Sequence, residues 1–284
     1  GTPCQIPVWV KPEPGEGGWV LRAKNGKTIA RMPAGVLYFE QCYYPFAEEA
    51  DLDKVRDALD ECMWTSIASP PGPLIAGPEG RQRLIDGAKA LRRKTDRAIL
   101  GLFGGNLLET GQFLFRNDNF LMLLAGDPQK AHRFLDILVE IHLQNLEAFL
   151  GAVGDSIDII VFGDDLGMQK GPQMSPKMYR EFFKPRHSIL WHRAKELANV
   201  KVMLHCCGGV RPLLRDLIEA GLDAINPVQI SCNGMEPQAL KNDFGKDITF
   251  WGGGCDTQYF LPESTPQEIR NHVKEMVKIW RPDG

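Results

Sequence analysis

The sequence lacks a long apolar run, and this absence limits the partners that the chain is expected to have. No stretch approaches the roughly 20 apolar residues that a transmembrane helix needs, and no signal peptide is recognisable. An excess of one charge is also missing, since 33 Lys and Arg stand against 36 Asp and Glu, a formal net charge of −3. We therefore expect neither a membrane nor a nucleic acid as a partner.

The sequence also lacks the regular cysteine spacing of a disulfide framework. Its seven cysteines are odd in number and scattered, which is typical of a reducing compartment. We therefore predict a cytoplasmic protein whose cysteines serve as thiols or metal ligands. No methionine begins the chain, and it stops just after an expected helix, so we interpret it as a fragment that lacks terminal segments of a longer protein.

What is present is an ordinary globular composition, with 43% hydrophobic and 24% charged residues in 284. Residues 1–80 are the least regular part and are expected to form a cap. There, Asn25-Gly26 lies between β-prone segments at 19–24 and 27–31, which predicts a β-hairpin insertion. A third strand is expected at 36–40, and a loop at Pro70-Pro71-Gly72-Pro73. Residues 81–284 are expected to form the core, within a single domain overall.

From about residue 82 the pattern of a helix followed by a strand repeats. Helices are expected at 83–95, 127–149, 175–197, 212–220, 237–243 and 265–280, and strands at 98–103, 157–162, 200–205, 224–227 and 248–251. Asp127-Pro128 supplies an N-cap and an N1 proline for the second helix, Thr265-Pro266-Gln267-Glu268 forms a capping box for the last, and Pro185 is expected to disturb the helix at 175–197. This alternation indicates an α/β protein with a parallel sheet. No G-x-G-x-x-G follows any strand, and polar residues gather at the strand ends. We therefore predict a (β/α)8 TIM barrel, with a doubly wound sheet as the alternative.

The segment V-K-V-M-L-H-C-C-G-G at residues 200–209 carries the strongest functional signal. It reads as a buried parallel strand that ends in His205, Cys206 and Cys207. Side chains two residues apart on a strand point the same way, so His205 and Cys207 are expected together, with Cys206 facing away toward the barrel exterior. An imidazole and a thiolate on one side suit zinc. The alternative is that the cysteines pack as small hydrophobes and His205 is a satisfied core residue.

Other strand ends supply further candidates. Asp164 and Asp165 follow one strand, and only one of the two can face the site, where it would bind substrate or orient a ligand. The alternative is that it caps a loop or pairs with an arginine. Four more side chains are expected at the same mouth, either contacting substrate or bonding their own loops: Asn226, Gln229, Asp256 and Gln258.

Several short motifs resemble, in the same order, those of the uroporphyrinogen decarboxylase superfamily, and specifically its methyltransferase-like branch. They are G-D-D-L-G at 163–167 with S-P-K-M-Y at 175–179, H-C-C-G-G at 205–209, E-A-G-L-D at 219–223 leading to N-P-V-Q at 226–229, F-W-G-G at 250–253, D-T-Q at 256–258, and L-P with T-P between 261 and 266. The resemblance covers residues from about 97 to 280, and it implies a (β/α)8 barrel.

The resemblance also implies a metal site. Methyltransferases of this branch bind zinc through His-x-Cys and a later cysteine, and His205 and Cys207 match the first pair. The later cysteine usually lies on the last barrel strand. Cys255 stands one strand earlier, after three glycines, and is therefore a candidate rather than a direct match. Cys206 also departs from the branch, in which a serine commonly stands between the two ligands.

The activity implied is a zinc-dependent transfer of a methyl group between a small methylated substrate, such as a methoxylated aromatic, and a corrinoid on a partner protein. Two alternatives stay open. One is a metal-free decarboxylase, although the visible strand ends offer few arginines to bind a substrate with many carboxylates. The other is a non-catalytic protein that binds a tetrapyrrole or corrinoid. A homodimer also stays open.

Overall fold

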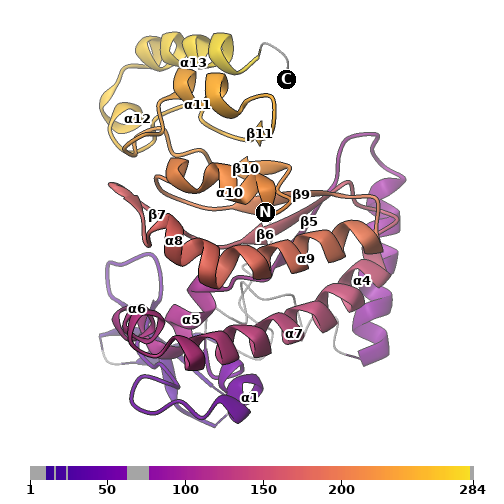
Figure 1. Ribbon diagram of the computed structural model, residues 1–284, viewed down its shortest axis with the longest axis vertical. Coiled ribbons are helices and arrows are strands. Elements are labelled where there is room, and N and C mark those ends of the chain that lie inside the picture. Colours follow the sequence, from indigo (N-terminus) through magenta and orange to yellow (C-terminus); the bar gives the residue numbers. More distant parts are fainter. Residues whose placement is uncertain (1–10, 16, 24, 63–76, 282–284) are drawn as a thin grey trace. The chain divides into compact units, whose positions relative to one another are not determined.

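The computed structural model describes residues 11–15, 17–23, 25–62 and 77–281 (Figure 1). The chain forms two compact units, residues 1–157 and 158–284. Helix α4 (Gly77–Arg92) packs on helix α7 (Pro128–Val153), and both lie in the first unit. The division expected near residue 80, within a single domain, stays a prediction.

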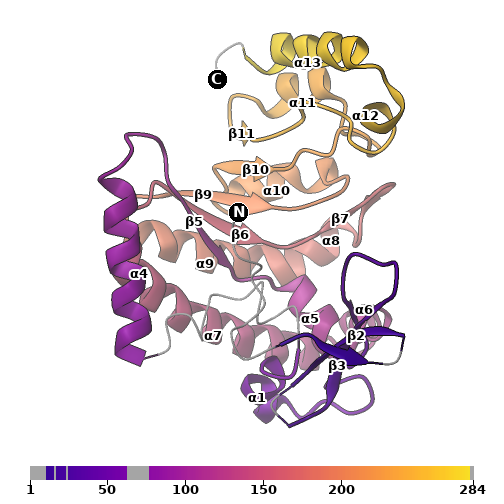
Figure 2. The same ribbon diagram turned by 180° about the vertical axis from the view of Figure 1, so that it is seen from behind.

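The first unit contains a four-stranded antiparallel sheet, two of whose strands are labelled in Figure 2. Its strands are β1 (Glu13–Gly15), β2 (Gly18–Arg22), β3 (Thr28–Pro33) and β4 (Glu40–Gln41). The predicted hairpin is confirmed, because β2 pairs with β3 across Asn25-Gly26 and Gly26 has a φ of 83°. The expected strand at 36–40 is wrong except at its end, because residues 36–39 form a bend without strand pairing and pairing begins at Glu40.

The first unit also contains helices, three of which share an aromatic core. They are the 3-10 turn η1 (Leu52–Lys54), α1 (Val55–Leu59), α4, α5 (Leu108–Phe115), α6 (Asn117–Gly126) and α7, with strand β5 (Leu100–Gly104) between α4 and α5. Phe115, Phe120 and Phe134 pack ring to ring at 5.0–5.7 Å. Helix α7 begins as predicted, with the Asp127 carboxylate accepting the Lys130 N–H at 3.0 Å. The loop expected at residues 70–73 lies outside the described residues.

The second unit is an α/β fold with a parallel sheet. Its strands are β6 (Ile159–Gly163), β9 (Lys201–His205), β10 (Ala224–Asn226) and β11 (Thr249–Phe250), adjacent in that order. The predicted alternation and parallel pairing are confirmed here. Register aligns Gly163 with His205 and His205 with Asn226, so the carboxyl ends of three strands lie side by side. Closure into an eight-stranded barrel stays a prediction.

The connections of the second unit are mostly helical. They are α8 (Pro176–Met178), the π-helix η2 (Tyr179–Phe183), α9 (Lys184–Leu197), the 3-10 turn η3 (Arg211–Leu213), α10 (Leu214–Glu219), α11 (Pro237–Phe244), α12 (Phe260–Glu263) and α13 (Pro266–Trp280), with a small hairpin of β7 (Gly167–Met168) and β8 (Gly171–Pro172). Helix α13 opens with the predicted capping box of Thr265 and Glu268.

The disturbance expected at Pro185 is a π-turn. Proline has no N–H to donate, and just before it the Lys184 N–H bonds to the carbonyl of Tyr179, five residues back. Buried Asp216 ties this turn to α10 by accepting from Arg180 and Lys184, both at 2.9 Å. Burial opposes the charge on Asp216, but the two cations hold its pKa below the usual value.

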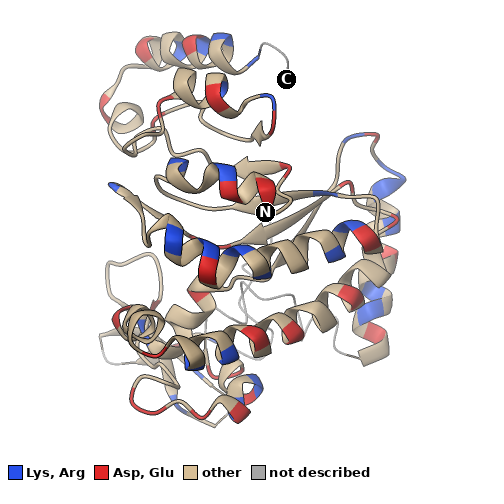
Figure 3. Ribbon diagram, viewed as in Figure 1, with Lys and Arg blue, Asp and Glu red and all other residues tan. Residues whose placement is uncertain are grey.

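Charge is distributed evenly over both units, as Figure 3 shows for the described residues, with basic and acidic side chains interspersed along the helices. This agrees with the small net charge of −3. None of the helices that the structure describes is both long and apolar enough to cross a membrane.

Candidate metal centre

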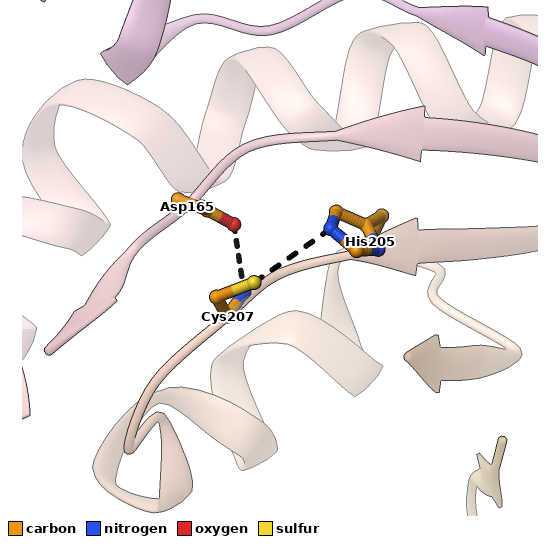
Figure 4. A group of neighbouring side chains, drawn as sticks. All are labelled: Asp165, His205 and Cys207. Carbon is orange, nitrogen blue, oxygen red and sulfur yellow. Dashed lines mark hydrogen bonds between the residues drawn. The ribbon is translucent and has the colours of Figure 1, made fainter. Parts of the chain in front are cut away.

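Asp165, His205 and Cys207 converge at the carboxyl ends of β6 and β9 (Figure 4). The Cys207 sulfur lies 3.7 Å from His205 Nε2, and one ligand atom from each of the three residues lies within 4.8 Å of the others. The backbone N–H of Cys207 donates to Asp165 Oδ1 at 2.7 Å. Strand register explains this proximity, because Gly163 and His205 are paired and the chain leaves both strands in the same direction.

The His205 ring is held from the side that faces away from Cys207. Its Nδ1 lies 2.7 Å from Asn226 Oδ1, and the Asn226 amide nitrogen donates to the Trp251 carbonyl at 2.9 Å. The ring itself is exposed, whereas Cys207 and Asp165 are half-buried. Asn226, predicted to contact substrate, is therefore bonded to a predicted metal ligand.

The loop that carries Cys207 is held by the next predicted residue, Gln229. The Gly208 N–H donates to Gln229 Oε1 at 2.9 Å. Gly208 has a φ of 88°, and a Cβ there would lie 2.3 Å from the carbonyl carbon of Gly167. Two backbones thus approach as closely as only glycine allows, and this contact sets the path of the chain on both sides of the site.

Asp164 points away from this group. Its side chain is fully buried, and its Oδ2 lies 3.3 Å from His187 Nε2. His187 Nδ1 lies 3.1 Å from the Tyr179 hydroxyl, and the imidazole stacks on Trp191 with ring centroids 4.7 Å apart. Burial, and secondarily the Asp164 charge, raises the pKa of Tyr179 well above its usual value. Of the two acids, Asp165 is the one that faces the site.

Neither this buried network nor the place of His187 in it was predicted from the sequence. The available signal was its spacing. His187 and Trp191 stand four residues apart on α9 and therefore share one helix face, which the structure turns inward. The catalytic role predicted for Asp164 stays a prediction.

Cys206, expected to face away from His205 and Cys207, is buried by protein. Its side chain is 2% exposed, and its sulfur accepts the Leu166 N–H at 3.3 Å. Cys206 points to the face of the β9 end that the polypeptide after β6 covers. Alternation along the strand therefore gave the direction of the thiol but not its burial. Burial raises the pKa of Cys206 well above the usual thiol value.

Cys206 is therefore expected to resist alkylation. Iodoacetamide reacts with the thiolate, which burial disfavours, so the native metal-free protein should be modified at exposed Cys42 and at Cys207 before Cys206. Peptide mass spectrometry after timed labelling measures the order, and denatured protein serves as the control in which all three react. Cys206 labelled as fast as Cys42 in the native protein would contradict the buried placement.

The remaining predicted residues lie on the segment after β11. Asp256 Oδ1 accepts the N–H groups of Gln258 and Tyr259 at 2.9 and 3.1 Å. Gln258 Oε1 accepts from the Ser231 hydroxyl at 3.1 Å. Cys255 is half-buried, and its thiol donates to the Asp256 carbonyl at 3.6 Å. The group of three metal-ligating side chains found in the described part of the chain contains Asp165, and Cys255 is outside it.

The donor set suits zinc. Imidazole nitrogen, thiolate sulfur and carboxylate oxygen are all zinc ligands, and three protein ligands are typical of a catalytic site that keeps a fourth position for water or substrate. Tetrahedral zinc with ordinary bond lengths separates a nitrogen and a sulfur ligand by about 3.6 Å. The 3.7 Å between His205 Nε2 and Cys207 Sγ is close to that separation.

Comparison with known proteins adds a family and a fold. The sequence model of the family described as Uroporphyrinogen decarboxylase (URO-D) matches residues 89–284. No curated protein sequence matches the chain. Among solved structures, a methyltransferase from Methanosarcina mazei is similar with a TM-score of 0.61 at 20% identity, over 88% of this chain. The chain spans 66% of that protein's length, and at this identity the likeness shows the fold alone.

Proposed function

Because the chain belongs to the uroporphyrinogen decarboxylase (URO-D) family, we propose that it is a zinc-dependent methyltransferase. It moves a methyl group between a small methylated substrate, with a methoxylated aromatic as the first candidate, and a corrinoid carried by a partner protein. The observation that carries the proposal is the convergence of His205 Nε2 and Cys207 Sγ at 3.7 Å, with Asp165 beside them.

Each of the three side chains has a role in this proposal. His205 Nε2, Cys207 Sγ and the Asp165 carboxylate hold the metal, with Cys255 as the alternative third ligand. Zinc bound there supplies Lewis-acid chemistry, which polarises the atom that carries the methyl group or keeps a thiol ionised at neutral pH. The reducing compartment predicted from the cysteine pattern would keep the Cys207 sulfur available as a ligand.

The surrounding residues orient the ligands rather than react. Asn226 holds the His205 ring, and Gln229 holds the Gly208 N–H of the loop that carries Cys207. Because the His205 ring is exposed, a substrate can approach the metal group from that side. The same exposure gives a partner protein access, which methyl transfer to a carried corrinoid requires.

The test combines metal analysis with an assay. Purified protein should contain about one zinc per chain. With a reduced corrinoid protein and a methoxylated aromatic, the absorbance of the corrinoid should report methylation, which a chelator abolishes and added zinc restores. Decarboxylation of uroporphyrinogen that survives chelation would contradict the proposal and favour a metal-free decarboxylase.

A further inference from the structure

We propose that Asn226 is a positioning residue that fixes both the orientation and the tautomer of His205, so that Nε2 is the ring nitrogen with a free lone pair. The inference rests on the proposed function only in taking Nε2 as the metal ligand. It assigns Asn226 a role other than the substrate contact predicted from its place at a strand end.

The first step is the orientation of the Asn226 amide. A backbone carbonyl can only accept a hydrogen bond, so the side-chain group 2.9 Å from the Trp251 oxygen must be the NH2 of the amide. The other end of the same amide, Oδ1, then faces His205 Nδ1 at 2.7 Å. The hydrogen bond to the Trp251 carbonyl therefore fixes which end of the Asn226 amide faces the imidazole.

The second step is the proton on His205. Oδ1 of an amide is an acceptor, so at 2.7 Å the Nδ1 atom must carry the hydrogen. A neutral imidazole has a single N–H, which leaves Nε2 unprotonated. Nε2 is the nitrogen that faces the Cys207 sulfur at 3.7 Å. The tautomer that Asn226 selects is therefore the one that can bind a metal beside Cys207.

The third step is the rigidity of the arrangement. Asn226 is paired in register with His205 across β9 and β10. On the other side of β10, the Trp251 N–H bonds to the Ile225 carbonyl at 2.8 Å. Three adjacent backbones therefore fix the row Trp251, Asn226, His205. Because Asn226 is already ordered in this way, it loses little conformational entropy when a metal binds to His205.

The direct test uses metal-free protein, so that it does not depend on the proposed activity. Protein labelled with 15N-histidine, studied at about pH 8.5, roughly two units above the ordinary imidazole pKa, should give long-range 1H–15N correlations that distinguish the tautomers. The chain has six histidines, and His205→Gln identifies the signals of interest. We expect the Nδ1–H tautomer at His205. An Nε2–H ring in the wild-type protein would overturn the proposal.

Two variants separate the acceptor from simple packing. Asn226→Leu keeps similar volume without an acceptor, and we expect it to lose the tautomer preference and about ten- to hundred-fold in affinity for Co²⁺ or Zn²⁺. Asn226→Asp keeps an oxygen opposite Nδ1 and should retain the Nδ1–H tautomer. Asn199→Ala, an exposed asparagine just before β9, is the matched control and should leave both measurements unchanged.

The outcomes distinguish this proposal from the function. If Asn226→Leu keeps both the tautomer and the metal affinity of the wild-type protein, or if Asn226→Asp behaves like Asn226→Leu, Asn226 does not position His205 as an acceptor. If the wild-type ring has the Nδ1–H tautomer but the protein binds no zinc, the positioning is supported and the zinc-dependent function is contradicted. Co²⁺ absorption bands report the thiolate ligand independently of turnover.

Discussion

Replacement of Cys207 by serine is expected to lower zinc affinity by at least about a hundred-fold, beyond the ten- to hundred-fold typical of residues that only support a ligand. The reason is that a hydroxyl does not ionise near neutral pH, whereas a thiol near zinc does. Of the three ligands, only His205 and Asp165 then remain, and the metal site lacks a thiolate. Zinc content after dialysis against a weak chelator, together with a titration, measures the loss.

Parallel variants identify the third ligand. Asp165 lies within the metal-ligating group, whereas Cys255 was predicted from the sequence. If Asp165 is the ligand, Asp165→Asn should lower zinc affinity strongly and Cys255→Ser should not, and the reverse result would assign Cys255. Cys42→Ser changes an exposed cysteine of the first unit and is the control that should bind zinc normally.

A zinc content of Cys207→Ser equal to that of the wild-type protein would refute the metal site. The same holds if the wild-type protein takes up no zinc while His205 and Cys207 are folded as described. Cys206→Ser serves a different purpose. Its thiol is buried against the Leu166 N–H, so the serine hydroxyl should cost about 1–3 kcal/mol of stability but leave the zinc ligands in place.

Replacement of Gly208 by alanine is expected to have the second large effect, a loss of about 2–5 kcal/mol in the free energy of unfolding of the second unit. Two costs add. A φ of 88° costs an L-residue roughly 1–2 kcal/mol, and a Cβ lying 2.3 Å from the backbone of Gly167 forces an overlap that typically costs about 1–3 kcal/mol. Backbone atoms cannot rotate away as a flexible side chain can.

The same substitution should also weaken metal binding, because Gly208 directly follows Cys207 and donates its N–H to Gln229. Urea unfolding followed by tryptophan fluorescence, and a zinc titration, measure the two effects. Gly87→Ala is the matched control, since Gly87 lies inside α4 with open space around it and alanine should stabilise that helix by about 0.5–1 kcal/mol. An unfolding midpoint of Gly208→Ala equal to that of the wild-type protein would contradict the close approach of the Gly208 and Gly167 backbones.

Features that depend on neighbouring residues were predictable from the sequence. The hairpin at Asn25-Gly26, the cap of α7 at Asp127-Pro128 and the capping box at Thr265 each depend on the chemistry of a few consecutive residues. The parallel sheet of the second unit was also predictable, because strand and helix periodicities alternate along the chain. Alternation within one strand likewise predicted that His205 and Cys207 would share a side.

Local patterns failed where the outcome depended on distant segments. Helices α5 and α6 were not predicted. The turn between them lies at Arg116, whose φ is 75°, and no glycine marks it in the sequence. Their aromatic side chains pack on Phe134 of α7, which is distant in the sequence. The burial of Cys206 was missed for a similar reason. Its cover comes from Leu166, forty positions earlier, and no pattern within residues 200–209 contains that information.

The sequence alone therefore determined which residue types stand at the ends of the strands, and that one of two adjacent acids must face the site. Only the tertiary structure decided that it is Asp165, because the choice depends on the register of β6 against β9. The register of β9 against β10 likewise brings Asn226 to His205. The register of a parallel sheet depends on which face of each strand is buried, and therefore on contacts between residues far apart in the chain.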